Sequence, residues 1–504
     1  MRETAMQDTE HYDVVIVGAG ISGIGAAYRL QTMSPGKSYL IVEARESLGG
    51  TWDLFKYPGL RSDSDMFTLG FPFEPWRGEK SIADGADILQ YVKDTAAKHG
   101  IDQRIRFGTK VAHGSWSSED ATWTLDLETA EGAGQVTSSF VYFASGYYNY
   151  AEGYTPEFPG RESFQGELIH PQFWPEGLDV AGKKVVVIGS GATAVTLIPA
   201  LVAQGTEHVT MLQRTPTYIL PLPAKDPIAN LARKLPHAQA AHTFNRWSNA
   251  VKTIAFYQFS RRMPRTATKV LTAGPRIAMR GSAAYDPKDF QPPYKPWDQR
   301  VCIIPDGDLF ATLREGGASI VTDTIDTFVP EGIRTSSGEV LEADIVVSAT
   351  GLAMQMAGGA TLDIDGEKVD YGAHYVYRGC MLEGVPNAAI AIGYTNASWT
   401  LRADLSATFF CKFVNQVSDN GFAFAYPRVS GQLTPGPVLD LTSGYVQRSM
   451  AKFPKRGDKA PWLVRQNFLL DSLDMRRAKP TDEMRFVRPG EAIRPGVGTA
   501  AGAA

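Results

Sequence analysis

Two glycine-rich segments, each between an apolar run and a helical pattern, constrain the fold of this 504-residue chain more than any other feature. The first follows the strand-like run His11–Val17 and precedes a helical pattern over Ile24–Leu30. It has the form G-x-G-x-x-G, with glycines at Gly18, Gly20 and Gly23. Such a loop lets the backbone approach a pyrophosphate, and the following helix offers unpaired N–H groups and the positive end of its dipole. We therefore predict a dinucleotide-binding β-α-β unit.

The acidic residue Glu43 indicates which dinucleotide the first unit binds. It ends a second predicted strand, Tyr39–Val42, and lies 20 residues after Gly23. A carboxylate at this place accepts hydrogen bonds from ribose hydroxyls and repels a 2′-phosphate. The first unit is therefore predicted to bind FAD.

The second glycine-rich segment repeats this layout with the opposite charge. It follows Lys183–Ile188, precedes a helix to Leu201 and a strand over His208–Leu212, and carries its small residues at Gly189, Gly191 and Ala194. Arg214 lies 20 residues after Ala194, and Thr215 follows it. A guanidinium and a hydroxyl bind the 2′-phosphate that a carboxylate rejects, so the second unit is predicted to bind NADPH.

These units predict an α/β fold with two Rossmann-like dinucleotide-binding domains. The apolar runs Phe140–Gly146 and Asp344–Gly351 end in small residues, as strands do where a chain passes between packed domains. Between them, helix formers punctuated by prolines predict a helical insertion in the NADPH domain. The expected boundaries are residues 1–145 and 352–488 for the FAD domain, 146–221 and 299–351 for the NADPH domain, 222–298 for the helical subdomain and 489–504 for a loose tail.

Composition excludes several classes of partner and location. The net charge is −4, and basic residues are mixed with acidic ones, so we expect no basic face for nucleic acid. No run of about 18 apolar residues predicts a membrane span, and Met1–Glu10 is too polar for a signal peptide. We therefore expect a cytosolic protein.

The chain has three cysteines, and no two of them are spaced as C-x-x-C: Cys302, Cys380 and Cys411. Their spacing argues against a disulfide framework and a metal site, and it excludes the redox dithiol of the flavin disulfide reductases. We expect the three thiols to be buried packing residues.

A longer motif lies just before the second glycine loop, within a predicted linker at residues 158–180. It reads F-x-G-x-x-x-H-x-x-x-W-P, with fixed positions at Phe164, Gly166, His170, Trp174 and Pro175. This motif resembles the fingerprint of the type I Baeyer–Villiger monooxygenases, which use FAD, NADPH and dioxygen to convert ketones to esters or lactones. The resemblance extends from Tyr12 to about Arg477 and is strongest to the ethionamide-activating subgroup, in the segments Tyr57–Phe67, Tyr294–Phe310 and Gly393–Leu405.

The resemblance implies roles for particular residues. The matching position for the family's active-site cation is Arg300, and Asp63 matches the carboxylate that orients it. The segment containing Gly50 and Trp52 resembles the loop that lies along the flavin. The fingerprint lies in a linker in this family, so we expect His170 to act on domain arrangement rather than in proton transfer.

One position departs from the family pattern. Many relatives carry a lysine immediately before the active-site arginine, whereas this chain has Gln299, so its preference for NADPH over NADH is expected to be weaker. The expected substrates are small-molecule ketones or sulfides together with dioxygen. Two other hypotheses remain: a flavin-containing monooxygenase that oxidises sulfur or nitrogen centres, and a flavoprotein redox sensor, against which the intact Asp63 and Arg300 argue.

Overall fold

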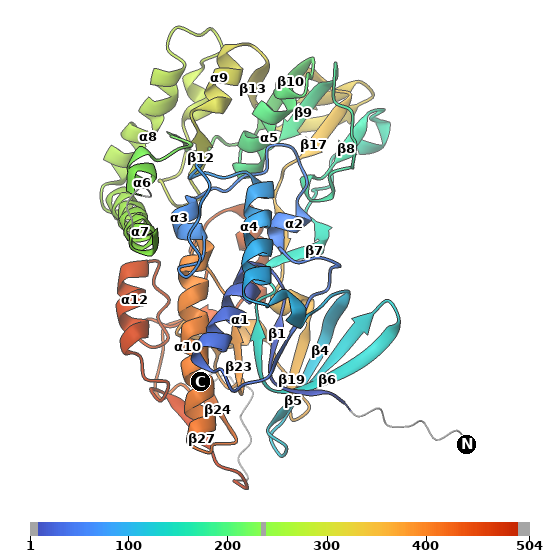
Figure 1. Cartoon of the computed structure of the whole chain (residues 1–504). Coiled ribbons are helices and arrows are strands. Elements are labelled where there is room, and N and C mark those ends of the chain that lie inside the picture. Colours follow the sequence, from blue (N-terminus) through green and yellow to red (C-terminus); the bar gives the residue numbers. More distant parts are fainter. Residues whose placement is uncertain (1–8, 233–237, 492–504) are drawn as a thin grey trace, which may run out of the picture.

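The computed structural model describes residues 9–232 and 238–491, in which two α/β bodies are built on separate sheets (Figure 1). Most of the predicted loose tail, residues 492–504, lies outside the described residues. Residues 233–237 of the predicted helical insertion, which include Leu235 and His237, also lie outside them. Each predicted dinucleotide unit forms the centre of one sheet. The predicted class, α/β with two Rossmann-like units and a helical insertion, is confirmed.

The larger sheet has nine strands in the order β20-β19-β4-β5-β6-β1-β2-β3, and β23 also pairs with β6. Its parallel centre places β1 between β2 and β6, while β4, β5 and β6 form an antiparallel extension. Strands from the second half of the chain complete the sheet, so this body is made from both ends of the sequence. The strands are β1 (His11–Val17), β2 (Tyr39–Val42), β3 (Ile105–Arg106), β4 (Thr109–Ser117), β5 (Thr122–Thr129), β6 (Gly132–Phe143), β19 (Thr361–Ile364), β20 (Glu367–Lys368) and β23 (Ala388–Ile390).

Helices cover the parallel centre of this sheet. The chain enters α1 (Ile21–Met33) directly from the first glycine loop, and α1 packs along α10 (Trp399–Asp419) in the same core cluster as α4 (Gly85–Lys98). The last four residues of β1 and all of β2 are buried on both faces, as parallel strands between layers require. Residues far apart in sequence therefore build one core beneath the glycine loop.

The smaller sheet has five parallel strands in the order β13-β10-β9-β17-β8. Its central strand β9 leads through the second glycine loop into α5 (Ala192–Ala203), which packs against α9 (Asp308–Arg314). The strands are β8 (Glu167–Ile169), β9 (Lys184–Ile188), β10 (His208–Gln213), β13 (Ala318–Thr322) and β17 (Ile345–Ser348).

The helical insertion lies along one side of the molecule, at the left of Figure 1. It contains α6 (Pro227–Ala232), α7 (Ala238–Arg262) and α8 (Pro264–Ala278). The last of these begins at Pro264, where the fixed φ of proline suits the first turn of a helix. Among the described residues, no helix is long and apolar enough to cross a bilayer.

An antiparallel ribbon connects the two bodies. It pairs β7 (Tyr148–Gly153) with β18 (Leu352–Met354). The two runs predicted to cross between domains end earlier as strands, at Phe143 and Ser348, and the ribbon follows them. Gly146 and Gly351, with φ of +70° and +114°, allow the turns at which the chain leaves each sheet.

Candidate active site

A cavity of about 640 Å³ lies where the two bodies meet. Its walls come from the first glycine loop, the end of β2, residues 49–64, the β7 segment and the start of α5. The cavity brings together seven residues that the sequence had marked: Gly18, Gly20, Glu43, Gly50, Trp52, Asp63 and Arg300. These residues are spread over 283 positions of the chain, so only the fold unites them.

The first glycine loop is shaped for a close approach by an anionic group. Gly18 has a φ of +106°, and a Cβ atom at Gly23 would lie 1.9 Å from the carbonyl oxygen of Gly18. The helix α1 that follows has no side-chain cap and no acidic residue in its first turn. Its unpaired N–H groups therefore remain available to a phosphate.

Glu43 is anchored at the edge of the cavity. Its side chain accepts hydrogen bonds from the Ala19 N–H at 2.7 Å and from the Arg45 N–H at 3.0 Å. Burial raises the pKa of Glu43 above its ordinary value. Each carboxylate oxygen has a second lone pair, which fits the acceptor role expected toward a ribose.

Arg300 and Asp63 form an ion pair in the wall of this cavity. The Arg300 Nη1 lies 2.6 Å from the Asp63 Oδ2, and the Arg300 Nε donates to the Thr395 carbonyl at 3.2 Å. The Asp63 carboxylate raises the pKa of Arg300 above its ordinary value, so the guanidinium stays charged. A guanidinium has five N–H donors, and within the described residues these two bonds leave three without a protein partner.

Both members of the pair are held by rigid turns. Trp297, in the turn before Arg300, has a φ of +70°, and its ring packs edge-on against Phe256 and Tyr257 of α7. On the other side, the backbone N–H of Ser62 donates to the Ala83 carbonyl at 2.9 Å, which fixes the residue before Asp63. The helical insertion thus supports the turn that carries Arg300.

Aromatic residues that sequence reasoning did not single out also line the cavity. The Tyr147 and Tyr148 hydroxyls lie 2.9 Å apart, and the Tyr147 ring packs 5.0 Å from the Trp399 ring. Burial raises the pKa of Tyr147 to about 12, so its phenol stays protonated and can donate a hydrogen bond. The tyrosine-rich run directly after Gly146 is the sequence signal that could have identified them.

A smaller void adjoins Arg300, and its lining contains no residue of the two glycine loops. Besides Arg300 and Tyr147, its lining includes Leu439, Leu441 and Tyr445. The last of these lies on α11 (Gly444–Ser449). Arg300 is the only charged residue in this lining, and the void, of about 10 Å³, has room for no more than about one water molecule.

The second glycine loop meets the same cavity only through the first turn of α5, where Ala192 and Thr193 lie in the wall. Like α1, α5 has no side-chain cap and no acidic residue in its first turn. The other residues predicted for the second dinucleotide do not line the cavity, and these are Gly189, Gly191, Ala194, Arg214 and Thr215. Arg214 is exposed at the end of β10, and the Thr215 carbonyl accepts a hydrogen bond from the Ser190 hydroxyl at 2.8 Å.

The fingerprint residues lie away from the cavity, and His170 contacts the ribbon. Its Nε2 donates to the Gly351 carbonyl at 3.2 Å, and its Nδ1 accepts from the Gln172 N–H at 3.2 Å. A Cβ atom at Gly153 of β7 would lie 2.5 Å from the His170 ring. The ring therefore contacts the end of β7 and the residue before β18, and burial lowers the pKa of His170, which favours the neutral form.

The other fingerprint residues pack against neighbouring side chains or allow close approach of the backbone. The Phe164 ring packs against Phe328 at 5.7 Å, and a Cβ atom at Gly166 would lie 2.3 Å from the Asp344 carbonyl oxygen. Trp174 is partly buried against the core of the smaller sheet, and Pro175 is exposed.

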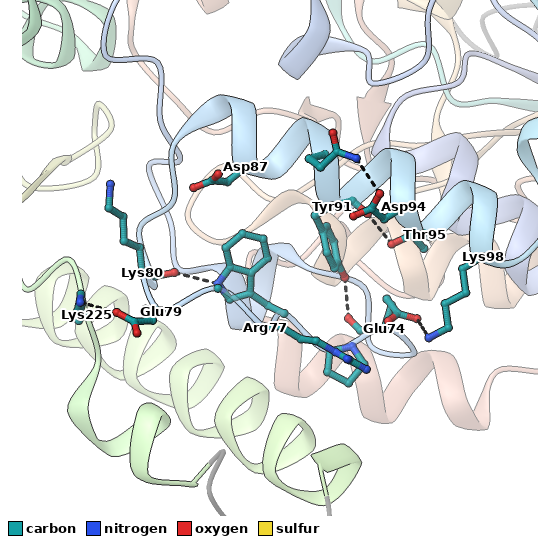
Figure 2. A pocket seen from close by; sticks show the side chains of 14 residues that line it. Glu74, Arg77, Glu79, Lys80, Asp87, Tyr91, Asp94, Thr95, Lys98 and Lys225 are labelled. Carbon is teal, nitrogen blue, oxygen red and sulfur yellow. Dashed lines mark hydrogen bonds and ion pairs between the residues drawn. The ribbon is translucent and has the colours of Figure 1, made fainter.

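A second depression, of about 770 Å³, lies between α4 and residues 74–80 (Figure 2). Its side chains are largely paired with one another: Lys98 with Glu74, Lys225 with Glu79, and the Trp76 ring N–H with the Lys80 carbonyl. None of the predicted cofactor residues lines it. Seven of the residues predicted from the sequence line the cavity at Arg300 instead.

The structure also bears on metal and thiol chemistry. All three cysteines are free and buried, as expected for packing residues. Among residues 9–232 and 238–491, no group of three or more histidine, cysteine, aspartate and glutamate side chains is arranged to hold a metal ion.

Comparisons with known proteins agree with this geometry. A family model described as "Pyridine nucleotide-disulphide oxidoreductase" matches residues 15–220, a region that contains no cysteine. The "FAD-containing monooxygenase EthA" of Mycobacterium tuberculosis is 51% identical over 484 residues, which cover 95% of this chain and 98% of that protein. The chain belongs to the FAD-containing monooxygenases. The resemblance inferred from the sequence motifs is therefore confirmed.

A further relative and two solved structures are also similar to this monooxygenase over most of its length. The "Probable FAD-binding monooxygenase AlmA" of an Acinetobacter species is 45% identical over 95% of this chain and 97% of that protein. A solved structure titled "Oxidized steroid monooxygenase bound to NADP" matches with a TM-score of 0.73 at 21% identity, covering 95% of this chain and 100% of that one. A cyclohexanone monooxygenase from Rhodococcus sp. Phi1 matches with a TM-score of 0.68 at 20% identity, covering 83% and 87%. The monooxygenase shares the fold of these two enzymes.

Proposed function

We propose that this monooxygenase uses NADPH and dioxygen to convert ketones to esters or lactones by oxygen insertion, with sulfide oxidation as a side activity. One observation carries the proposal: Arg300, held by Asp63, lines the cavity of the first glycine loop and keeps donors that no described residue of the chain accepts from. A cation with free donors in the wall of a cofactor cavity is suited to stabilise negative charge that develops on oxygen.

The cavity fits FAD, the cofactor of the family. The uncapped N-terminus of α1 would receive the pyrophosphate, and Glu43 would accept from the ribose. Gly50 and Trp52 would lie beside the ring system. When bound, FAD would accept a hydride from NADPH and supply one oxygen atom of dioxygen to the substrate.

The residues of the chain would stabilise negative charge on oxygen, orient the Arg300 guanidinium and exclude water. Arg300 would donate hydrogen bonds to the oxygen on which negative charge develops, and Asp63 would fix the plane of the guanidinium. The rings of Tyr147, Tyr148 and Trp399 would exclude water from this region. The protonated phenols add no negative charge that would oppose Arg300.

The second glycine loop is proposed to hold NADPH. The uncapped N-terminus of α5 would receive its pyrophosphate, and Arg214 with Thr215 would bind the 2′-phosphate. Gln299 would leave this phosphate without a second cation. We also propose the domain boundaries predicted from the sequence, with residues 158–180 as the linker that contains the fingerprint.

Product analysis tests the proposed reaction. The purified FAD-loaded protein is incubated under air with NADPH and either a ketone or a matched sulfide, and the ester, sulfoxide and hydrogen peroxide are quantified. We expect ester from the ketone in proportion to the NADPH oxidised. Sulfoxide without any ester would instead favour a monooxygenase of heteroatoms, and NADPH oxidation that yields only hydrogen peroxide would contradict both reactions.

A further inference from the structure

The charges of the monooxygenase are unevenly distributed along the chain. Residues 227–285 contain ten lysines and arginines and no aspartate or glutamate. The 54 acidic residues of the chain, spread evenly, would put about six in a stretch of this length. The expectation that basic and acidic residues are mixed is therefore wrong for this stretch, which coincides with the helical insertion.

The helix α8 and its flanking residues present five of these cations to solvent. They are Arg262, Arg265, Lys269, Arg276 and Arg280, and each is exposed. In the described part of the chain, none of the five forms an ion pair with a carboxylate. Arg265, Lys269 and Arg276 lie within α8 and are four and seven residues apart, so they lie on one face of the helix. Arg262 and Arg280 flank the helix.

An apolar stripe runs beside these cations. Met263, Val270 and Ile277 recur every seven residues, and their exposed fractions are 52, 56 and 72 %. Val270 and Ile277 directly follow Lys269 and Arg276, so the stripe is about 100° around the helix from the row of cations.

The remaining face of α8 anchors the helix to the protein. Ala267, Leu271 and Pro275, spaced by four residues, are buried. Leu271 belongs to the core cluster that contains Tyr218 and Val301, the residue after Arg300. The cationic and apolar stripes therefore stand on a helix that is fixed to the body of the enzyme.

We propose that α8 is a docking surface for an anionic membrane. The cations would contact anionic lipid headgroups, and the exposed aliphatic side chains would enter the boundary between headgroups and acyl chains. A nucleic acid would match the cations, but binding to phosphates gives no reason for three protruding apolar side chains beside them. Docking of this kind requires no helix that crosses the bilayer.

Vesicle sedimentation tests the proposal on the full-length, FAD-loaded enzyme. Vesicles of phosphatidylcholine alone are compared with vesicles that also contain phosphatidylglycerol. We expect the enzyme to sediment with the anionic vesicles only, and high salt to release part of it. The double variant Lys269→Glu, Arg276→Glu removes two cations. Each cation near an anionic surface changes partitioning by about fivefold, so partitioning of this variant should fall by at least about 25-fold.

The apolar stripe is tested separately. Val270→Ser with Ile277→Ser should reduce partitioning by at least about tenfold while leaving the salt dependence in place, because only buried hydrocarbon is lost. The matched control is Lys368→Glu with Lys455→Glu, two exposed lysines outside the insertion, which should bind like the parent. Flavin content and melting temperature are compared across all variants to establish that each one is folded.

Three outcomes would overturn the proposal. The first is equal binding to neutral and anionic vesicles, and the second is binding to anionic vesicles that neither pair of α8 substitutions weakens. The third is binding to a short DNA duplex, measured by fluorescence polarisation, without binding to vesicles, which would assign the cations to nucleic acid.

Discussion

Glu43 and Arg214 occupy the same place in the two nucleotide units but differ in charge and surroundings. Glu43 is buried and held by two backbone N–H groups, so its position is set before any ligand binds. Arg214 is exposed, and within the described residues no carboxylate forms an ion pair with it. Its guanidinium is therefore available to a phosphate.

We predict that Arg214→Ala raises the Michaelis constant for NADPH by roughly 10- to 150-fold and leaves that for NADH nearly unchanged. The reason is the loss of one charge-assisted contact to the 2′-phosphate, which typically contributes about 1.5–3 kcal/mol. Steady-state kinetics with both nucleotides provide the measurement. Equal damage with NADPH and NADH would show that Arg214 does not read the 2′-phosphate.

A second prediction concerns the first glycine loop. Gly23→Ala should abolish retention of FAD, because its Cβ atom would lie 1.9 Å from the Gly18 carbonyl oxygen and force the loop apart. Gly36→Ala is the matched control, since no atom lies within 4 Å of its Cβ position. Flavin absorbance after gel filtration gives the result. Full retention of FAD by the Gly23 variant would mean that the loop tolerates the displacement.

At the scale of elements, the ribbon of β7 and β18 is the connection that His170 stabilises. The histidine hydrogen-bonds Gly351 at one end of β18 and packs against Gly153 at the end of β7. Because burial lowers its pKa, the ring remains neutral at neutral and alkaline pH and keeps its Nδ1 as an acceptor. This geometry fits a residue that sets the arrangement of the two bodies.

We therefore expect His170→Ala to lower turnover without loss of bound FAD and without removing a limb of the pH profile. A general acid or base would remove one limb of the curve of kcat/KM against pH. His113→Ala, on β4 of the larger sheet and outside the cavity lining, is the control and should turn over like the parent. If the His170 variant lacks one limb, the histidine takes part in proton transfer.

At the scale of the whole molecule, the cavity depends on both ends of the chain. Its wall includes Gly18 and Glu43 from the first part of the larger body and Leu352, Gly358 and Trp399 from the second. A ligand that binds there would connect these segments only in the folded state, and binding to the folded state alone raises stability.

Removal of FAD should therefore lower the melting temperature by several degrees, and reloading should restore it. At a free FAD concentration 1,000 times its dissociation constant, the stabilisation would be about 4 kcal/mol. Differential scanning calorimetry of the holoenzyme, the apoprotein and the reloaded protein makes the comparison. Equal melting temperatures would contradict the expectation that FAD binds the folded state alone.

Much of the fold could be predicted because local patterns determine it. The strands β1 and β2 have the bounds that their apolar runs predicted, and the two glycine loops lead into helices as expected. The approach of Asp63 to Arg300 followed only from the family resemblance, because the two residues are 237 positions apart. No spacing rule connects residues at such a distance.

The parts that sequence reasoning missed depend on how the two bodies meet. Tyr147 and Tyr148 enter the cavity because the chain turns at Gly146 into a ribbon whose pairing is tertiary. The ion pair between Arg61, in the cavity wall, and Asp308, at the start of α9, likewise crosses between the two bodies. Such contacts have no local signal in the sequence.

The most direct test of the account is ester formation by Arg300→Ala. We predict that this variant binds FAD and NADPH but forms ester from a ketone about 10²–10³ times more slowly, as expected when one preorganised donor is removed from a dry site. Arg300→Lys should recover little, because an ammonium cannot reproduce the planar contact with Asp63. Flavin reduction is followed by stopped flow and ester by gas chromatography. Ester formation at the parental rate by Arg300→Ala would contradict the central role given to this residue.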